Sequence, residues 1–255
     1  MSVAASDLIL RGANTMPDDD SVQYVGGLID TKKKVEQTEI VPSGVIEGVS
    51  NTGGDTRTLD VTYRDAAGVS ATKLITLNGA TPVSFAVSME RILKAVASSS
   101  LGGKITIRKV SAGTDLATLI SGVSQVRRPF YNAVAPAAGT KSYYEKIFYR
   151  NTHGVLALTS ASIYESADPT GLVTFALDGV AAACALNLGV NNGANNRNTP
   201  PSARITSFSN ASKGVRANNN LQPGSAQGIW LRLLLSNTDT ATKTSYTVGV
   251  KGNST

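Results

Sequence analysis

The stretch Thr58-Leu59-Asp60-Val61-Thr62-Tyr63 alternates apolar and polar side chains, which is the pattern of a strand with one buried face. A turn at residues 65–68 (DAAG) separates it from a second β-rich run at residues 71–77, which ends at the Asn78-Gly79 turn. Two such runs joined by a short turn predict a β-hairpin. We therefore expect a sheet in this part of the chain.

The strand pattern continues on the C-terminal side of this hairpin. Residues 83–89 alternate again, and residues 104–110 form a further strand pattern with Ile inward and basic residues outward. Residues 89–97 are ambiguous, because Glu90 and Lys94 have helical i,i+4 spacing while the apolar residues also fit a strand. We predict a strand there, with a short helix as the alternative.

A second strand-rich block follows a segment without periodicity. Residues 129–140 are rich in Ala and Pro and predict a linker. The β-rich runs beyond it are short and are separated by turns. They cover residues 142–150, 155–164, 172–177, 204–208, 229–235 and 245–250. The sequence thus predicts an all-β chain with two β-sandwich domains, at residues 46–128 and 141–255.

The first 45 residues have a different character. They contain turn signals and runs of like charge, and little apolar periodicity. We predict an extended N-terminal arm over residues 1–45 that becomes ordered only along a partner. The side chains expected to contact that partner are Leu8, Leu10, Tyr24, Lys32, Lys33 and Lys34.

Composition argues against several kinds of chemistry. The chain has 255 residues, of which 16% are charged, and it contains one Cys and one His. A zinc site of Cys and His ligands, an internal disulfide and a Cys–His catalytic pair are therefore not expected. The formal charge of +6 is spread thinly rather than focused, so nucleic acid is not an expected partner. The sequence predicts no secretion leader and no membrane span, which favours synthesis in a cytoplasm.

Individual polar residues give no catalytic signature. Residues 18–20 (DDD) are weighed as a Ca²⁺ site and assigned to a solvated or partner-facing turn, because adjacent carboxylates do not converge on one ion. His153 is predicted to lie in a surface turn, and Cys184 to be a small buried residue. A glycosidase-like pair has no supporting motif among the carboxylates considered, which are Glu145, Glu165, Asp168 and Asp178. We predict a non-enzymatic protein with no cofactor and no metal.

A long loop rich in Asn, at residues 187–220, interrupts the second block. Loops of this length inside a compact domain are usually functional or ordered by a neighbour. We expect Asn195 and Asn196 in this loop, together with Trp230, to contact a partner. A neighbouring subunit is the preferred partner, because the loop contains one aromatic residue, Phe208, and sugars usually need stacking rings. A carbohydrate-binding or host-adhesion module is the alternative.

Several stretches resemble the immunoglobulin-like β-sandwich modules of tailed-bacteriophage virion proteins. In the first block they are residues 73–83 (KLITLNGATPV), 89–92 (MERI) and 102–107 (GGKITI). In the second block they are residues 144–151 (YEKIFYRN), 230–235 (WLRLLL) and 246–250 (YTVGV). Residues 13–19 (ANTMPDD), with Gly26 and Gly27, are similar to small structural proteins of phage heads and tails.

This resemblance implies two immunoglobulin-like β-sandwich domains in an accessory component of the virion. The component would decorate the capsid or belong to the neck, the collar or the tail. Its expected partners are other virion proteins and further copies of itself in a homo-oligomer. No membrane is expected as a partner.

Overall fold

The structure of the protein is a computed structural model. It describes residues 2–20, 24–35, 44–99, 103–110, 113–168, 170–178, 193–194, 196–201, 205–215, 218–239 and 245–254. The regular elements in these residues are strands and one short 3-10 helix, Ala5–Asp7. The all-β class is confirmed. A search of the described residues finds no helix with the length and apolarity to cross a membrane.

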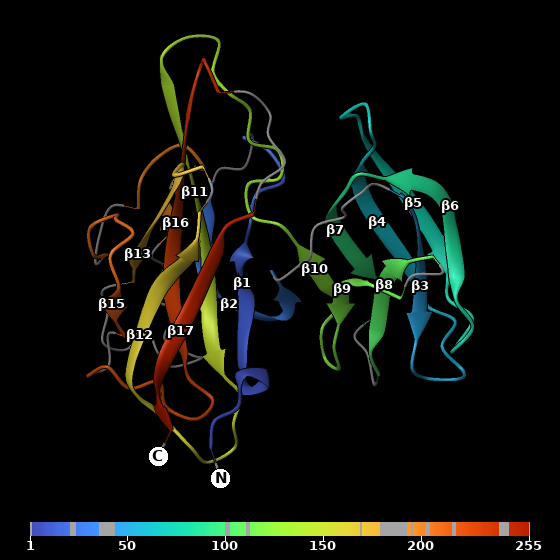
Figure 1. Ribbon diagram of the computed structural model, residues 1–255, viewed down its shortest axis with the longest axis horizontal. Coiled ribbons are helices and arrows are strands. Elements are labelled where there is room, and N and C mark those ends of the chain that lie inside the picture. Colours follow the sequence, from blue (N-terminus) through green and yellow to red (C-terminus); the bar gives the residue numbers. More distant parts are fainter. Residues whose placement is uncertain are drawn as a thin grey trace. The chain divides into compact units, whose positions relative to one another are not determined.

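The chain forms two compact units, which we name by their place in the sequence. The terminal unit contains Met1–Asp30 and Phe130–Thr255, and the central unit contains Thr31–Pro129. Strand β2 (Val25–Lys34) contributes residues to both units. Figure 1 shows the elements of each unit.

Strands of two sheets build the central unit. Strands β10, β7, β4 and β5 follow one another in the first sheet, and the end of β2 pairs in parallel with β10. Strands β6, β3, β8 and β9 form the second sheet. The bounds are β3 (Gly44–Ser50), β4 (Thr58–Arg64), β5 (Ser70–Thr76), β6 (Val83–Met89), β7 (Arg91–Ala97), β8 (Ile105–Lys109), β9 (Asp115–Leu119) and β10 (Gln125–Arg127).

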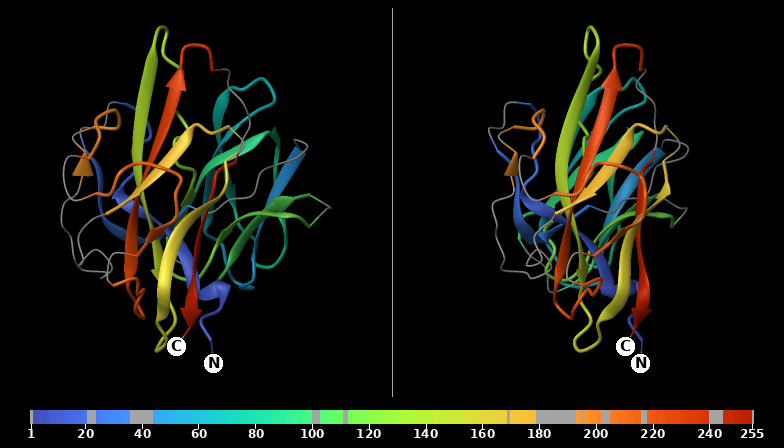
Figure 2. Two further views of the ribbon diagram at one scale, coloured as in Figure 1. Left: turned by 60° about the vertical axis from the view of Figure 1, so that its left-hand side comes forward. Right: turned by 90° about the vertical axis from the view of Figure 1, so that its left-hand side faces the viewer.

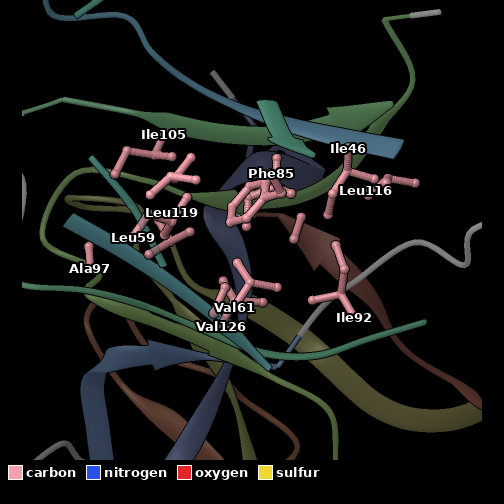
Figure 3. Packing of buried hydrophobic residues seen from close by; sticks show 14 of the residues in the cluster. Ile46, Leu59, Val61, Phe85, Ile92, Ala97, Ile105, Leu116, Leu119 and Val126 are labelled. Carbon is pink, nitrogen blue, oxygen red and sulfur yellow. The ribbon is translucent and has the colours of Figure 1, made fainter. Parts of the chain in front are cut away.

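One apolar cluster lies between these two sheets (Figure 3). Leu59 and Val61 of β4 enter it because they are the inward residues of the alternating pattern, and Ile46 and Phe85 reach it from the opposite sheet. Each fully buried side chain of this size stabilises the fold by roughly 1.5–3 kcal/mol. The predicted strand at residues 89–97 is confirmed, since β7 occupies Arg91–Ala97 and no helix forms there.

The terminal unit also contains strands of two sheets. The first has the order β13, β16, β11, β1 and β2, with β14 paired to β2, and the second has the order β15, β12 and β17. The bounds are β1 (Leu8–Thr15), β11 (Thr140–Asn151), β12 (Leu158–Ala167), β13 (Val173–Leu177), β14 (Gly193–Ala194), β15 (Lys213–Gly214), β16 (Ala226–Ser236) and β17 (Thr247–Ser254). Both views of Figure 2 show β11 and β16 side by side, as their antiparallel register requires.

Strand β11 is buried along most of its length. Every residue from Tyr143 to Tyr149 is buried, so side chains on both faces of this strand are covered. On one face, the Tyr149 hydroxyl donates a hydrogen bond to the Val248 carbonyl oxygen of β17, at 2.9 Å. On the other face, Tyr144 and Trp230 belong to one apolar cluster.

The structure corrects the predicted N-terminal arm. Strand β1 is an internal strand of the terminal unit, where it pairs with β11 from Leu8 opposite Asn151 to Gly12 opposite Ile147. The segment is therefore ordered within this chain rather than only along a partner. Its pairing strand lies far away in the sequence, and β1 lacks a two-residue alternation because Arg11, Gly12 and Ala13 are all buried.

The predicted linker also differs from the structure. The boundary between the units lies between Pro129 and Phe130, and the residues that follow pack on β11. The Phe130 amide donates to Glu145 Oε1 at 3.0 Å. The Tyr143 hydroxyl donates to the Val134 carbonyl oxygen at 2.6 Å and accepts from the Val134 amide at 3.1 Å. Residues 130–134 are thus part of the terminal unit.

Candidate functional site

The candidate site is the Asn-rich segment, residues 187–220, together with the groups that hold it on the terminal unit. Asp178 precedes the segment and Arg197 lies within it. Each of these residues forms an ion pair with β11. Asp178 pairs with Lys146, and Arg197 pairs with the adjacent residue Glu145. Because successive side chains of a strand point to opposite faces, the two ion pairs lie on opposite sides of the sheet.

The first ion pair joins Lys146 and Asp178. The distance between Lys146 Nζ and Asp178 Oδ2 is 2.6 Å, and both side chains are buried. Lys146 Nζ also donates to the Gly27 carbonyl oxygen at 3.2 Å and lies 5.7 Å from the centre of the Trp230 ring. Burial lowers the pKa of Lys146, and the Asp178 carboxylate opposes this shift. The ammonium group is therefore compensated by a carboxylate, a carbonyl and an aromatic face.

Strand β16 is shaped to admit this pair. A Cβ atom at Gly228 would lie 3.1 Å from both Asp178 Cβ and Lys146 Cε. The backbone adds support, because the Asp178 amide donates to the Gly228 carbonyl oxygen at 3.0 Å. Gln227 Nε2 donates to the same carbonyl oxygen at 2.8 Å. A glycine at this position thus allows Asp178 to approach Lys146.

The second ion pair joins Glu145 and Arg197, whose side chains are completely buried. Arg197 Nη2 lies 3.3 Å from Glu145 Oε1, and the guanidinium carbon lies 5.1 Å from the centre of the Tyr143 ring. The Arg197 carbonyl oxygen accepts a hydrogen bond from the Tyr144 amide at 2.7 Å. Both the backbone and the side chain of Arg197 therefore fix this part of the segment to β11.

Further contacts continue along the described part of the segment. Asn196 Oδ1 accepts hydrogen bonds from the Asn198 amide and the Thr199 hydroxyl, both at 2.9 Å, and so stabilises the turn that contains Arg197. Ile205 forms a β-bridge with Asp178. Phe208 packs edge-on against Tyr144, with 5.5 Å between ring centres. The segment is thus held against the sheet at several places.

The structure tests the accessibility of the predicted contact residues in this region. Trp230 is 0% exposed, so its expected place on a contact surface is wrong. The physical reason is its position on β16, where it packs between Ala176 of β13 and Tyr144 of β11. Asn196 is half-buried, and Asn195 lies outside the described residues.

Five of the six predicted contact residues of the N-terminal region lie on strands, and Tyr24 lies just before β2. Leu8 and Leu10 are half-buried in β1. Lys32 is exposed, Lys33 is buried and Lys34 is half-buried at the end of β2, where Lys33 pairs with Gln125 and Lys34 with Val126. These lysines are therefore strand residues rather than part of a loose basic arm. Tyr24 is exposed and remains available on the surface.

The acidic run at residues 18–20 takes part in ion pairing. Asp20 Oδ2 lies 2.6 Å from Lys141 Nζ, and Asp20 Oδ1 lies 3.8 Å from Arg197 Nη1. The Asp18 carbonyl oxygen accepts from Asn132 Nδ2 at 2.7 Å. Within the residues that the structure describes, no group of three His, Cys, Asp or Glu side chains is arranged to hold a metal ion.

Two of the remaining candidates for chemistry, His153 and Asp168, have structural partners, and a third, Cys184, lies outside the described residues. His153 lies in the turn between β11 and β12, as predicted, and its Nδ1 accepts from the Val155 and Leu156 amides at 3.1 and 2.9 Å. Asp168 accepts from the Thr170 amide at 3.1 Å and from the Val173 amide at 3.0 Å. Cys184 is outside the described residues.

Sequence reasoning missed the roles of Lys146 and Arg197. The available signal was the run Tyr143–Tyr149 (YYEKIFY), in which two adjacent charges interrupt a row of large apolar and aromatic side chains. A charge within such a run is buried when the strand is internal, and it then needs a partner of opposite sign. Comparisons with protein families, curated proteins and solved structures found no match to this chain.

Proposed function

We propose that the protein is a non-enzymatic structural component of a tailed-phage virion that acts through protein–protein contacts. Its place would be the capsid surface, the neck or collar, or the tail, and it would assemble with other virion proteins and with further copies of itself. We also propose that both units are immunoglobulin-like β-sandwich domains. The two sheets around one apolar cluster in the central unit support that assignment.

The observation that carries this proposal is the attachment of the Asn-rich segment by two buried ion pairs. A rigid scaffold that holds a long irregular segment is a common way to present a binding surface. The segment offers amide and hydroxyl groups, and one of its charged side chains, Arg197, is turned inward to Glu145. This chemistry suits recognition of a neighbouring protein surface rather than proton transfer or nucleophilic attack.

Open sheet edges give a second kind of contact surface. Strand β5 ends the order of its sheet, and Leu74 on this strand is 57% exposed. The backbone groups at a sheet edge offer hydrogen bonds to a neighbouring strand. Lys73 is half-buried beside Leu74, and inward-turned charges of this kind limit uncontrolled edge pairing. Such an edge favours specific contacts within an assembly over aggregation.

The carbohydrate-binding alternative has less support. Its expected contact region was the Asn-rich loop together with Trp230, and the Trp230 ring is buried. Phe208 packs against Tyr144 and lies under the guanidinium group of Arg232, at 5.5 Å from the ring centre. Neither aromatic residue is presented as an open platform for a sugar.

Mass spectrometry of phage particles purified by repeated density-gradient centrifugation tests this proposal. The phage that encodes this chain provides the sample, and a lysate cleared of particles provides the control. We expect the chain in the particle fraction at a fixed ratio to the major capsid protein through successive gradients. A chain that stays in the cleared lysate would refute the virion assignment.

A further inference from the structure

Two arginine side chains lie next to each other on the terminal unit. In the pairing of β1 with β11, Arg11 is opposite Phe148 and Ile9 is opposite Arg150. Residues directly opposite share a face, and residues two apart on one strand also share a face. Arg11 and Arg150 are therefore diagonal neighbours on the same face of the sheet.

These two side chains have hydrogen-bond donors without acceptors. Arg11 is only 5% exposed, and its Nε and Nη1 atoms are buried without a hydrogen-bond partner. Arg150 is half-buried, and its Nε atom is likewise buried without a hydrogen-bond partner. A buried guanidinium group with unused donors is unfavourable, because it has lost its hydration without compensation.

The positive charge of the two arginines is only partly compensated. Burial lowers the pKa of Arg11, and the positive charge of Arg150 lowers it further. The carboxylate of Asp30 on β2 acts in the opposite direction and raises the pKa of Arg11. Two positive charges thus face one negative charge at this place.

Arg232 on the same sheet face shows the contrast. It is opposite Tyr144, two strand positions away from Lys146, and so shares the face of Arg150. Its Nε donates to Thr174 Oγ1 at 3.1 Å, and its guanidinium group lies over the Phe208 ring. An arginine on this face can therefore be satisfied within the chain, whereas Arg11 and Arg150 are not.

We propose that Arg11 and Arg150 form a binding site for a small tetrahedral oxyanion of the phosphate type. Such an anion offers several acceptor oxygens, which match the planar donor forks of two guanidinium groups. Its negative charge balances the excess positive charge beside Asp30. The partly exposed Arg150 provides the side from which the anion approaches, and Arg11 forms the inner end of the site.

Titration of the full chain with inorganic phosphate, followed by thermal unfolding, tests this site. The reference titration uses sodium chloride at matched ionic strength, because salt alone screens the repulsion between the arginines. Phosphate is expected to raise the melting temperature in a saturable way, as a ligand that binds only the folded state does. The substitution Arg150→Gln is expected to weaken phosphate binding at least tenfold.

The matched control is Arg232→Gln, which removes a satisfied arginine from the same face and is expected to leave phosphate binding unchanged. The substitution Arg11→Gln is expected to abolish binding, and if it prevents folding, Arg150→Gln still decides the question. A phosphate effect no larger than that of chloride would overturn the proposal. Equal phosphate binding by Arg150→Gln and the unaltered chain would also overturn it, as would a stronger response to acetate than to phosphate.

Discussion

Glu145 and Lys146 are consecutive residues on β11, yet each forms a buried ion pair on a different face of the sheet. Their partners, Arg197 and Asp178, lie on either side of residues 179–195. One peptide unit of the scaffold thereby anchors the chain on both sides of that stretch. Separating either buried ion pair would leave an uncompensated charge inside the protein, which is strongly unfavourable. The two pairs therefore fix the chain at defined places on β11.

Removal of one partner from the Lys146–Asp178 pair should destabilise the terminal unit strongly. The substitution Lys146→Met leaves the Asp178 carboxylate buried without its cation, which should cost about 3–5 kcal/mol. The double variant Lys146→Met/Asp178→Leu should recover most of this loss, because no uncompensated charge remains. Denaturant unfolding can be followed through the fluorescence of Trp230, the only tryptophan of the chain.

An exposed ion pair provides the control for this experiment. Lys104 and Asp115 lie 3.7 Å apart with side chains that are 46% and 51% exposed. This pair lies in the central unit, and Lys104→Met should change the unfolding free energy of that unit by less than about 1 kcal/mol in calorimetry, because solvent screens such pairs. Equal effects of Lys146→Met and Lys104→Met would show that the buried pair does not stabilise the terminal unit.

The Glu145–Arg197 pair should control how firmly the Asn-rich segment is held. The substitution Glu145→Gln removes the negative charge that faces the Arg197 guanidinium, with little change in volume. Amide hydrogen exchange measured by mass spectrometry should become faster in residues 196–201 and 205–215, while the central unit stays unchanged. If exchange in these residues were unaltered, Glu145 would not anchor the segment.

Acid should weaken the central unit through Asp55. Hydrogen bonds from the Arg57 side chain lower the pKa of the Asp55 carboxyl to about 2, from the reference value of 3.8. Since the folded pKa is the lower one, the stabilisation is complete above about pH 4 and is lost as the pH falls toward 2. The effect amounts to about 2 kcal/mol. Calorimetry across this range should show a shallower pH dependence for Asp55→Asn, and an identical dependence would contradict the assignment.

The backbone of Gly53 lies so close to Gly79 that no residue with a Cβ atom should fit at position 79. Its φ of +55° favours glycine, and a Cβ atom there would lie 2.1 Å from the Gly53 carbonyl oxygen. The substitution Gly79→Ala should destabilise the central unit by about 2 kcal/mol or more, measured by thermal unfolding. Gly54→Ala serves as the control, because nothing lies within 4 Å of its Cβ position. Similar melting temperatures for the two variants would refute this reading of the loop.

Local patterns predicted the central unit well because its strands bury one face. In β4, Leu59, Val61 and Tyr63 alternate with more exposed residues, so a short window of sequence contains the required information. The same reasoning failed for β1. This strand is internal and its partner β11 lies more than a hundred residues away, so no short window shows the pairing.

The candidate site was predicted only in its general location. The Asn-rich segment was identified from composition, but the residues that hold it were not. Lys146 and Asp178 meet across β16, which lies between β11 and β13, and Glu145 and Arg197 meet where the segment returns to β11. Trp230 was predicted to lie on a contact surface and is buried, because the sequence around one aromatic residue does not show which face of its strand is covered.

A cryo-electron microscopy map of the purified particle tests the central claim most directly. We expect density for both units of this chain in the virion, with residues 196–201 and 205–215 of the terminal unit against a neighbouring subunit. We also expect the ion pairs of Glu145 and Lys146 to be retained there. A particle that lacks this density, or one in which the segment faces solvent in every copy, would refute the proposed role of this chain.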